Sequence, residues 1–214
     1  MKPGYHESRL PPDERRDVLW EVLWQAFFRK RVAEESCVLD LGSGYGQFIN
    51  NAVARRRIAV DAWPDFAMHL APGVEAIVAS VADLSAIDAG TVDYAFASNL
   101  FEHLTQVEFA SVLKQLHAKL SANGTLTILQ PNYRYAYREY FDDYTHISIY
   151  SHVSLTDFLV ANGYEVIELQ PRFLPLTIKS RLPVWPWLIR LYLSLPFKPL
   201  GKQMLVVARP KRPD

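Results

Sequence analysis

The chain has 214 residues, half of them hydrophobic and about a fifth charged. This composition excludes a disordered chain, and the length suits one globular domain with a full core. Lys plus Arg and Asp plus Glu each total 23, so the zero formal net charge gives no signature of nucleic-acid binding. The single cysteine, Cys37, excludes an intramolecular disulfide and a cysteine-built zinc site. We therefore expect one domain over residues 1–214 and no nucleic-acid partner.

The charges are distributed unevenly along the chain. Residues 172–214 contain nine Lys and Arg and one acid, Asp214, which leaves 14 basic and 22 acidic residues before them. A basic and aromatic C-terminal region suggests an anionic partner or a membrane surface for that end. The beginning of the chain lacks the apolar stretch of a secretory signal, so we expect a cytoplasmic protein.

The first helix is expected just after a pair of prolines. Pro11 and Pro12 block a helix before Asp13, where acidic residues typical of a helix N-terminus begin. Apolar residues at helical spacing follow, and the basic residues 29–31 are expected to close the helix. We therefore expect an N-terminal arm and helix over residues 1–35.

The segment 38–48, VLDLGSGYGQF, carries the strongest pattern in the chain. It predicts a strand at about 37–41, a glycine-rich turn, and a helix from about 47 to 55 that ends at the basic residues 55–57. Parallel α/β proteins place nucleotide-like ligands at such a strand–turn–helix corner. Glycine lets the backbone approach a ligand because it has no Cβ. The amides at the helix N-terminus suit an anionic or carboxylate group.

The spacing of the glycines within this turn limits the classes of ligand that it suits. The dinucleotide fingerprint requires a glycine at position 47, where Gln47 stands. Asp40 would be a poor neighbour for a pyrophosphate and suits a cationic amino group or a sulfonium. Residues 39–46, LDLGSGYG, resemble the first motif of the class I S-adenosylmethionine (SAM)-dependent methyltransferases. The resemblance implies an α/β, Rossmann-like three-layer sandwich, with a mostly parallel seven-stranded sheet and an antiparallel last strand. It also implies SAM as cofactor and S-adenosylhomocysteine as product.

Two further acidic residues extend this resemblance. A second strand is expected at 58–61, and its last residue, Asp61, falls where the family binds both ribose hydroxyls. Asp83 falls where the family accepts a hydrogen bond from the adenine amino group, and Trp63 is expected to lie against the ribose or adenine. The resemblance thus implies a cofactor site formed by Asp40, Gly42, Ser43, Gly44, Gly46, Asp61, Ala62, Trp63, Asp83, Leu84, Ser98 and Asn99.

The segment 98–104, SNLFEHL, follows a fourth strand expected at 92–97. It resembles the stretch that borders the donor methyl in the family, and His103 within it is expected to bind the substrate. Residues 105–108 match a capping box, so a helix is expected to begin there and to stop at 121–124.

The segment 133–146 is unusually aromatic, since seven of its 14 residues are aromatic when His146 is counted. Rings interleaved with charged side chains favour a polar acceptor such as a sugar. The segment also resembles the D-x-T-H stretch of methyltransferases encoded with surface-polysaccharide genes. We expect His146 to act as general base, because an imidazole titrates near neutral pH, and Asp143 to orient it or bind the acceptor. Tyr133 and Tyr137 are expected to bind the acceptor; the alternative is a packed insertion without chemistry.

The last part of the chain predicts a sheet edge with a long insertion. A helix is expected from Ser154, and strands at 165–169 and 202–209 are expected to form an antiparallel hairpin. Within the apolar and basic insertion at 171–201, the strongly apolar stretch 183–197 is interrupted by Arg190 and three prolines, so it is not expected to span a membrane. The part 182–200 of the insertion is expected to meet a membrane surface, a second subunit or the body of the protein.

These patterns favour a methyltransferase that acts on a sugar hydroxyl of a cell-surface polysaccharide or a lipid-linked precursor. Transfer from a sulfonium needs alignment rather than activation, and no ligand spacing for a metal is visible, so no metal is expected. A cytoplasmic enzyme at the inner face of the membrane would suit such an acceptor. Three alternatives stay open: a small lipophilic acceptor such as a quinone precursor, a catalytically inactive SAM-binding partner subunit, and a dinucleotide oxidoreductase.

Overall fold

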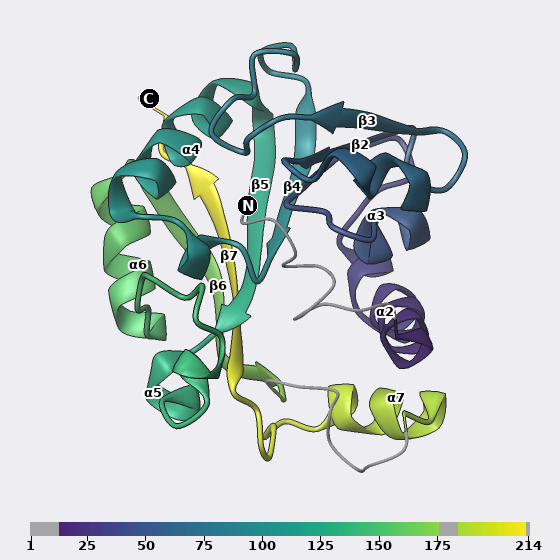
Figure 1. Ribbon diagram of the computed structural model, residues 1–214, viewed down its shortest axis with the longest axis vertical. Helices are drawn as coiled ribbons and strands as arrows, with labels where there is room; N and C mark the ends of the chain where they lie inside the picture. Colours follow the sequence, from purple (N-terminus) through teal and green to yellow (C-terminus); the bar gives the residue numbers. More distant parts are fainter. Residues whose placement is uncertain (1–12, 176–183, 213–214) are drawn as a thin grey trace.

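The computed structural model describes residues 13–175 and 184–212, and the expected arm at 1–12 lies outside them. The described residues form a seven-stranded sheet with helices on both faces (Figure 1). The strands are β1 Cys37–Leu41, β2 Arg56–Asp61, β3 Val74–Val78, β4 Val92–Ser98, β5 Leu120–Pro131, β6 Tyr164–Leu174 and β7 Gln203–Pro210. The α-helices are α2 Glu14–Ala26, α3 Gln47–Asn51, α4 Gln106–Lys119, α5 Tyr133–Ala136, α6 His152–Ala161 and α7 Pro186–Ser194. Short 3₁₀ helices are η1 Phe28–Lys30, η2 Pro64–His69, η3 Phe101–His103 and η4 Tyr140–Asp142.

The strand order is β3-β2-β1-β4-β5-β7-β6. Neighbouring strands from β3 to β5 pair in parallel, whereas β7 is antiparallel to both β5 and β6. All five residues of β1 are buried, because a central parallel strand is covered on both faces. The expected fold, a mostly parallel seven-stranded sheet with an antiparallel last strand, is confirmed.

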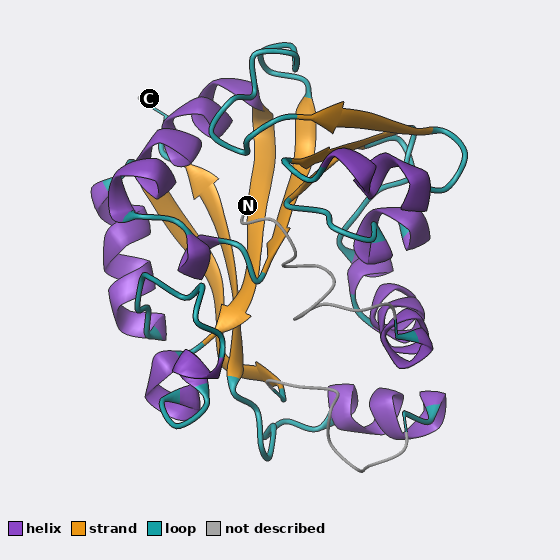
Figure 2. Ribbon diagram, viewed as in Figure 1, coloured by secondary structure: helices purple, strands orange, loops and turns teal. Residues whose placement is uncertain are grey.

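The sheet separates two hydrophobic clusters and makes the middle of three layers (Figure 2). Successive side chains of β4 point to opposite faces. Ala95 and Ala97 join the cluster under α4 and α6, and Tyr94 and Phe96 join the one under α2 and α3. The face of β4 under α4 and α6 therefore carries small side chains, and the face under α2 and α3 carries aromatic rings.

The N-terminus of α4 has the expected capping box. The Thr105 hydroxyl accepts from the Glu108 N–H, and the Glu108 carboxylate accepts from the Thr105 N–H at 2.8 Å. We expect Thr105→Ala to lower the free energy of unfolding by about 1 kcal/mol, because the Glu108 N–H loses its acceptor and the Glu108 carboxylate loses the hydrogen bond from the Thr105 hydroxyl. Urea denaturation measures this, with Val107→Ala as control, since Val107 is 80% exposed in the same turn. A variant as stable as the wild type would contradict the capping role.

Several predicted helix ends are wrong, because polar residues at element ends carry little periodic signal. The helix expected to reach 55 ends at Asn51, and Arg56 begins β2 rather than closing a helix. Its guanidinium makes two 2.8 Å hydrogen bonds to the Glu75 carboxylate on the neighbouring strand β3. The first helix ends at Ala26, and the basic residues 29–31 follow in and after η1.

Two other predicted boundaries are also wrong, the first because of a distant contact and the second because of a local cap. The segment 121–124 lies inside β5 instead of stopping a helix, and a Cβ on Gly124 would lie 2.6 Å from the Val92 carbonyl oxygen. The helix expected from Ser154 begins at His152, since the Ser151 hydroxyl caps it through the Ser154 N–H.

The expected insertion at 171–201 is partly strand and partly helix. β6 continues to Leu174, and α7 lies beside α2, where the Arg190 guanidinium donates to Gln25 Oε1 at 2.6 Å. Residues 176–183 lie outside the described part. Within the described ranges, no helix is both long and apolar enough to cross a bilayer.

Candidate functional site

The glycine-rich turn between β1 and α3 has a backbone that favours glycine. Gly42, Gly44 and Gly46 have φ of 67°, 52° and 69°, in the left-handed region. A Cβ on Gly42 would also lie 2.9 Å from Leu100 Cδ1. The Ser43 hydroxyl in this turn is buried and has no hydrogen-bond partner among the described residues. The turn therefore contains a buried hydroxyl that forms no hydrogen bond within the described part of the chain.

Two carboxyl groups are buried beside this turn. Asp61, at the end of β2, is 1% exposed and accepts the Gly44 N–H at 2.9 Å and the Trp63 N–H at 2.8 Å. Asp40 is 3% exposed, and burial raises its pKa well above the usual range, with the Asp61 carboxylate raising it further. A cationic ligand group would offset both effects.

Three aromatic rings gather next to Asp61. The Trp63 ring stacks on His69 with centroids 5.2 Å apart, and Tyr45 meets both rings edge-on. Ala62 between Asp61 and Trp63 is exposed. Tyr45 and His69 were not singled out in the sequence, since their contact with Trp63 depends on how η2 folds back towards the turn.

The third acidic position differs from the first two. Asp83 is exposed and accepts the Ser85 N–H at 3.1 Å, and hydrogen bonds from Ser85 lower its pKa. Leu84 is 1% exposed, and its N–H donates to Gln115 Oε1 at 2.9 Å. A ligand could use the Leu84 amide only by exchanging that hydrogen bond.

The loop after β4 lies against the glycine-rich turn through Leu100. Asn99 has a φ of 48°, which is uncommon outside glycine. Its side chain donates to Ser98 Oγ at 3.2 Å and accepts from Gln203 Nε2 at 2.8 Å. The predicted residues Ser98 and Asn99 are thus fixed between the turn and β7.

The tyrosine-rich segment is attached to the same loop. The N–H groups of Ile147 and Ser148 both donate to the Glu102 carbonyl, at 2.9 and 3.1 Å. The rings of His103 and His146 meet with centroids 4.8 Å apart. The structure therefore brings together two predicted histidines that are 43 positions apart in the sequence.

Asp143 is connected to His103 through Thr145, a link that the sequence did not indicate. Asp143 Oδ1 accepts the Thr145 hydroxyl at 2.6 Å, and Thr145 Oγ1 lies 2.9 Å from His103 Nδ1. Burial raises the pKa of Asp143, but the hydrogen bonds from Thr145 outweigh it and lower that pKa overall. Burial, and then the neighbouring His146, lower the pKa of His103 to about 4, so its ring is neutral near pH 7.

Glu102 is a site residue that the sequence analysis missed. It is fully buried, and neither carboxylate oxygen has a hydrogen-bond partner in the described part of the chain. Burial raises its pKa to about 8. In the sequence, a glutamate next to a histidine is only a weak signal of a functional site.

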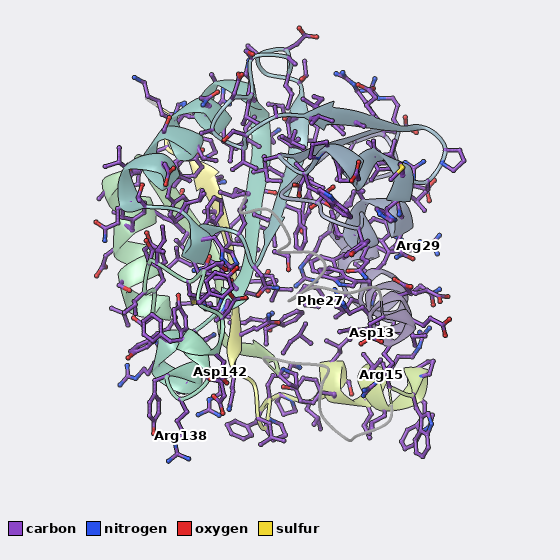
Figure 3. The ribbon with its side chains drawn as sticks, in the orientation of Figure 1. Asp13, Arg15, Phe27, Arg29, Arg138 and Asp142 are labelled. Carbon is purple, nitrogen blue, oxygen red and sulfur yellow. The ribbon has the colours of Figure 1, made fainter. Side chains whose placement is uncertain are left out.

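The two predicted substrate tyrosines lie further out. Tyr133 is half-buried, with its ring 5.2 Å from that of Tyr140, and Tyr137 is 54% exposed. The Arg138 guanidinium contacts the Tyr137 ring, and Figure 3 shows Arg138 extending from the segment away from the sheet.

The strand order is that of the Rossmann-like fold of methyltransferases, with the glycine-rich turn directly after β1. The family model described as methyltransferase domain matches residues 13–169, and the chain belongs to this family. Family and fold together make it a SAM-dependent methyltransferase. No curated protein matches the sequence significantly.

Three solved structures with the same fold are methyltransferases, and one of the three is named for its acceptor. A SAM-dependent methyltransferase from Archaeoglobus fulgidus is 18% identical, with a TM-score of 0.69, and the match covers 95% of this chain and 96% of that one. A chain from the complex of a Haloferax volcanii methyltransferase with the Trm112 activator is 16% identical, with a TM-score of 0.71 and 93% of each chain covered. Geranyl diphosphate C-methyltransferase from Streptomyces coelicolor A3(2) is 16% identical, with a TM-score of 0.60, covering 87% of this chain and 76% of that one.

Proposed function

We propose that this methyltransferase moves the methyl group of SAM to a sugar hydroxyl in a cell-surface polysaccharide or its lipid-linked precursor. The observation that supports this acceptor is the position of the tyrosine-rich segment, which the Glu102 carbonyl holds against the loop after β4. That loop in turn contacts Gly42 through Leu100. The residues that we propose to bind the acceptor are therefore held next to the turn that we assign to the cofactor.

The residues of the glycine-rich turn fit SAM. In the proposal, Asp61 binds the ribose hydroxyls, since an ionised carboxylate has room for acceptor bonds beyond the two backbone N–H groups that it holds. The Asp40 carboxyl faces the cationic methionyl end, and the Ser43 hydroxyl gains a partner there. The Trp63 ring lies along the nucleoside, with Ala62 beside it, and Asp83 is exposed for the adenine amino group. Leu84, Ser98 and Asn99 complete the proposed cofactor site. Leu84 belongs to its buried layer, because its side chain is part of the hydrophobic core.

SAM binding is expected to release a proton and to strengthen as pH rises through the raised pKa of Asp40. Burial favours protonated Asp40 in the free protein, whereas a cationic ligand beside it favours the ionised form. Calorimetry in buffers of different ionisation enthalpy, over the acidic range in which the ligand amino group stays charged, measures the proton count. Asp40→Asn should abolish the release; wild-type binding without proton release would contradict the assignment.

The bound sulfonium supplies an already activated methyl group, so the protein mainly aligns the acceptor with it. The transfer itself needs no metal ion. In the proposal, His146 takes the proton of the acceptor hydroxyl. Its Nδ1 lies 2.6 Å from the Tyr140 carbonyl, which only accepts, so Nε2 is the basic nitrogen of the neutral ring. Asp143 contributes negative charge nearby, and His103 borders the acceptor.

A sugar acceptor is favoured by the exposed rings of the segment. Tyr137, Phe141 and Tyr144 are 54%, 54% and 58% exposed, and the segment mixes them with charged side chains. Sugars stack on such rings while their hydroxyls form hydrogen bonds. The test is transfer from labelled SAM to a panel of sugar nucleotides, lipid-linked saccharides and quinols. Labelling of a saccharide supports the proposal, and labelling of a quinol-like ring alone overturns it.

A lipophilic acceptor is the second candidate, favoured by the apolar outer face of α7. A methyltransferase with the same fold acts on geranyl diphosphate. A third candidate is a partner subunit, since another relative forms a complex with an activator. A wild-type protein that binds SAM but labels nothing in a cell lysate would favour this third candidate.

We also propose that α7 places the enzyme at the inner face of a membrane. Trp185 at the N-cap of α7 and Trp187 and Leu191 on the helix are 53%, 59% and 51% exposed, and Lys198 follows the helix. Tryptophan beside basic residues suits an anionic lipid interface. We expect the protein to sediment with anionic vesicles and Trp187→Ala to do so less, with exposed Val107→Ala on α4 as control. Sedimentation unchanged in Trp187→Ala, or absent in the wild type, would contradict this location.

A further inference from the structure

The buried Glu102 carboxylate would be stabilised by a positively charged partner. Its side chain has no exposure, and both carboxylate oxygens lack hydrogen-bond partners in the described part of the chain. A buried carboxylate without compensation is strongly unfavourable in its ionised form. Two imidazoles lie next to it, because one ligand atom from each of Glu102, His103 and His146 falls within 4.8 Å of the other two.

Hydrogen bonds set the tautomers of both histidines. His103 Nδ1 lies 3.2 Å from the Thr145 carbonyl, which only accepts, so Nδ1 carries the hydrogen. The Thr145 hydroxyl gives its own proton to Asp143 and accepts from His103 Nδ1 as well. His146 Nδ1 is held by the Tyr140 carbonyl in the same way. Each neutral ring therefore has its lone pair on Nε2.

This arrangement is the one that orients metal-binding histidines. A ligating imidazole usually donates its other N–H to a carbonyl or carboxylate, which fixes the ring and raises its basicity. Here His103 is fixed by Thr145, behind which Asp143 accepts the hydroxyl proton, and His146 is fixed by Tyr140. Glu102 itself is held through its backbone carbonyl by the N–H groups of residues 147 and 148.

We propose that Glu102, His103 and His146 bind one divalent transition-metal ion at the acceptor side of the site. Two imidazoles and one carboxylate suit Zn²⁺ and similar first-row ions better than Mg²⁺ or Ca²⁺, which prefer oxygen ligands. In a tetrahedral site, metal–ligand bonds of about 2.1 Å place the ligand atoms about 3.4 Å from one another. The three ligand atoms lie within 4.8 Å of one another here, so the cluster closes by up to about an ångström or slightly more on binding. The charge of the ion compensates Glu102.

Three protein ligands leave coordination positions for an acceptor hydroxyl, whose proton the ion would make more acidic. The proposal goes beyond the proposed function and gives His146 a different role, since a ligating Nε2 cannot also accept a proton. Glu102 and His146 are 44 positions apart, so no ligand spacing was visible in the sequence. The expectation that no metal is bound stays a prediction, and the Co²⁺ experiment below tests it against this proposal.

The test is Co²⁺ binding to the full chain, with any purification tag removed and metal stripped by a chelator. We expect one Co²⁺ per chain with visible absorption bands of low coordination number, and competition by Zn²⁺. Glu102→Gln and His146→Gln should each weaken binding by at least about tenfold. His117→Ala is the control, because His117 lies on α4 outside the cluster and should bind as the wild type does.

Failure of the metal site and failure of the proposed function give different results. The proposal is overturned if the wild type binds no Co²⁺, or if both glutamine variants bind it as tightly as the wild type does. Calorimetry with SAM on the same metal-free samples reports the cofactor site separately and checks that each variant is folded. If one glutamine variant does not fold, the other decides the test.

Discussion

Asp61→Ala is expected to abolish measurable SAM binding, with a loss of affinity of at least about 100-fold. A carboxylate that binds two ribose hydroxyls makes charge-assisted hydrogen bonds worth about 1.5–3 kcal/mol each, and about 2.7 kcal/mol is a factor of 100. The variant also removes the acceptor for the Gly44 and Trp63 N–H groups, which loosens the glycine-rich turn. Calorimetry with S-adenosylhomocysteine measures the effect.

The matched control for this variant is Asp65→Asn, which removes an exposed carboxylate on η2 only four residues further along the chain. It should bind the cofactor with wild-type affinity. Circular dichroism and urea denaturation confirm that each variant is folded. If folded Asp61→Ala binds S-adenosylhomocysteine within a factor of two of the wild type, Asp61 does not bind the ribose.

His146→Ala is expected to lower kcat by about 10²- to 10⁴-fold while SAM binding stays unchanged. The ring lies on the acceptor side, against His103 and Tyr140, and its loss leaves the acceptor hydroxyl without the group that takes its proton. Steady-state kinetics with the acceptor identified in the labelling panel measures the change. His117→Ala is again the control and should keep full activity.

The pH profile and the response to a chelator distinguish the two roles assigned to His146. If it is a general base, wild-type activity persists with a chelator present and falls at low pH as the imidazole is protonated. If it is a metal ligand, the chelator lowers wild-type activity and added Zn²⁺ restores it. Full activity in His146→Ala would remove both roles.

The fold and the glycine-rich turn could be predicted from sequence because their signals are local. β1 is a short apolar run with the turn directly after it, so strand, turn and following helix fall within one stretch of 15 residues, 37–51. The capping box of α4 is likewise contained in four residues, 105–108, and is present as expected. The antiparallel last strand was predicted from the family resemblance rather than from the residues of β7, and the strand pairing confirms it.

The acceptor side could be predicted only in part, because its contacts join distant segments. His146 was singled out by its motif, but its nearness to Glu102 depends on residues 147 and 148 docking on the loop after β4. Thr145 carries the connection from Asp143 to His103, and no spacing in the sequence indicates it. The start of β2 at Arg56 was missed for the same reason, since its partner Glu75 lies on another strand.

The most direct test of the central claim is calorimetry of the wild-type chain with SAM and with NAD under identical conditions. A sulfonium nucleoside held between Asp40, Asp61 and the turn at residues 42–46 should bind at one site per chain, and NAD should give no heat of binding. Binding of NAD, or no binding of SAM by folded protein, would contradict the assignment of this corner of the sheet to the cofactor.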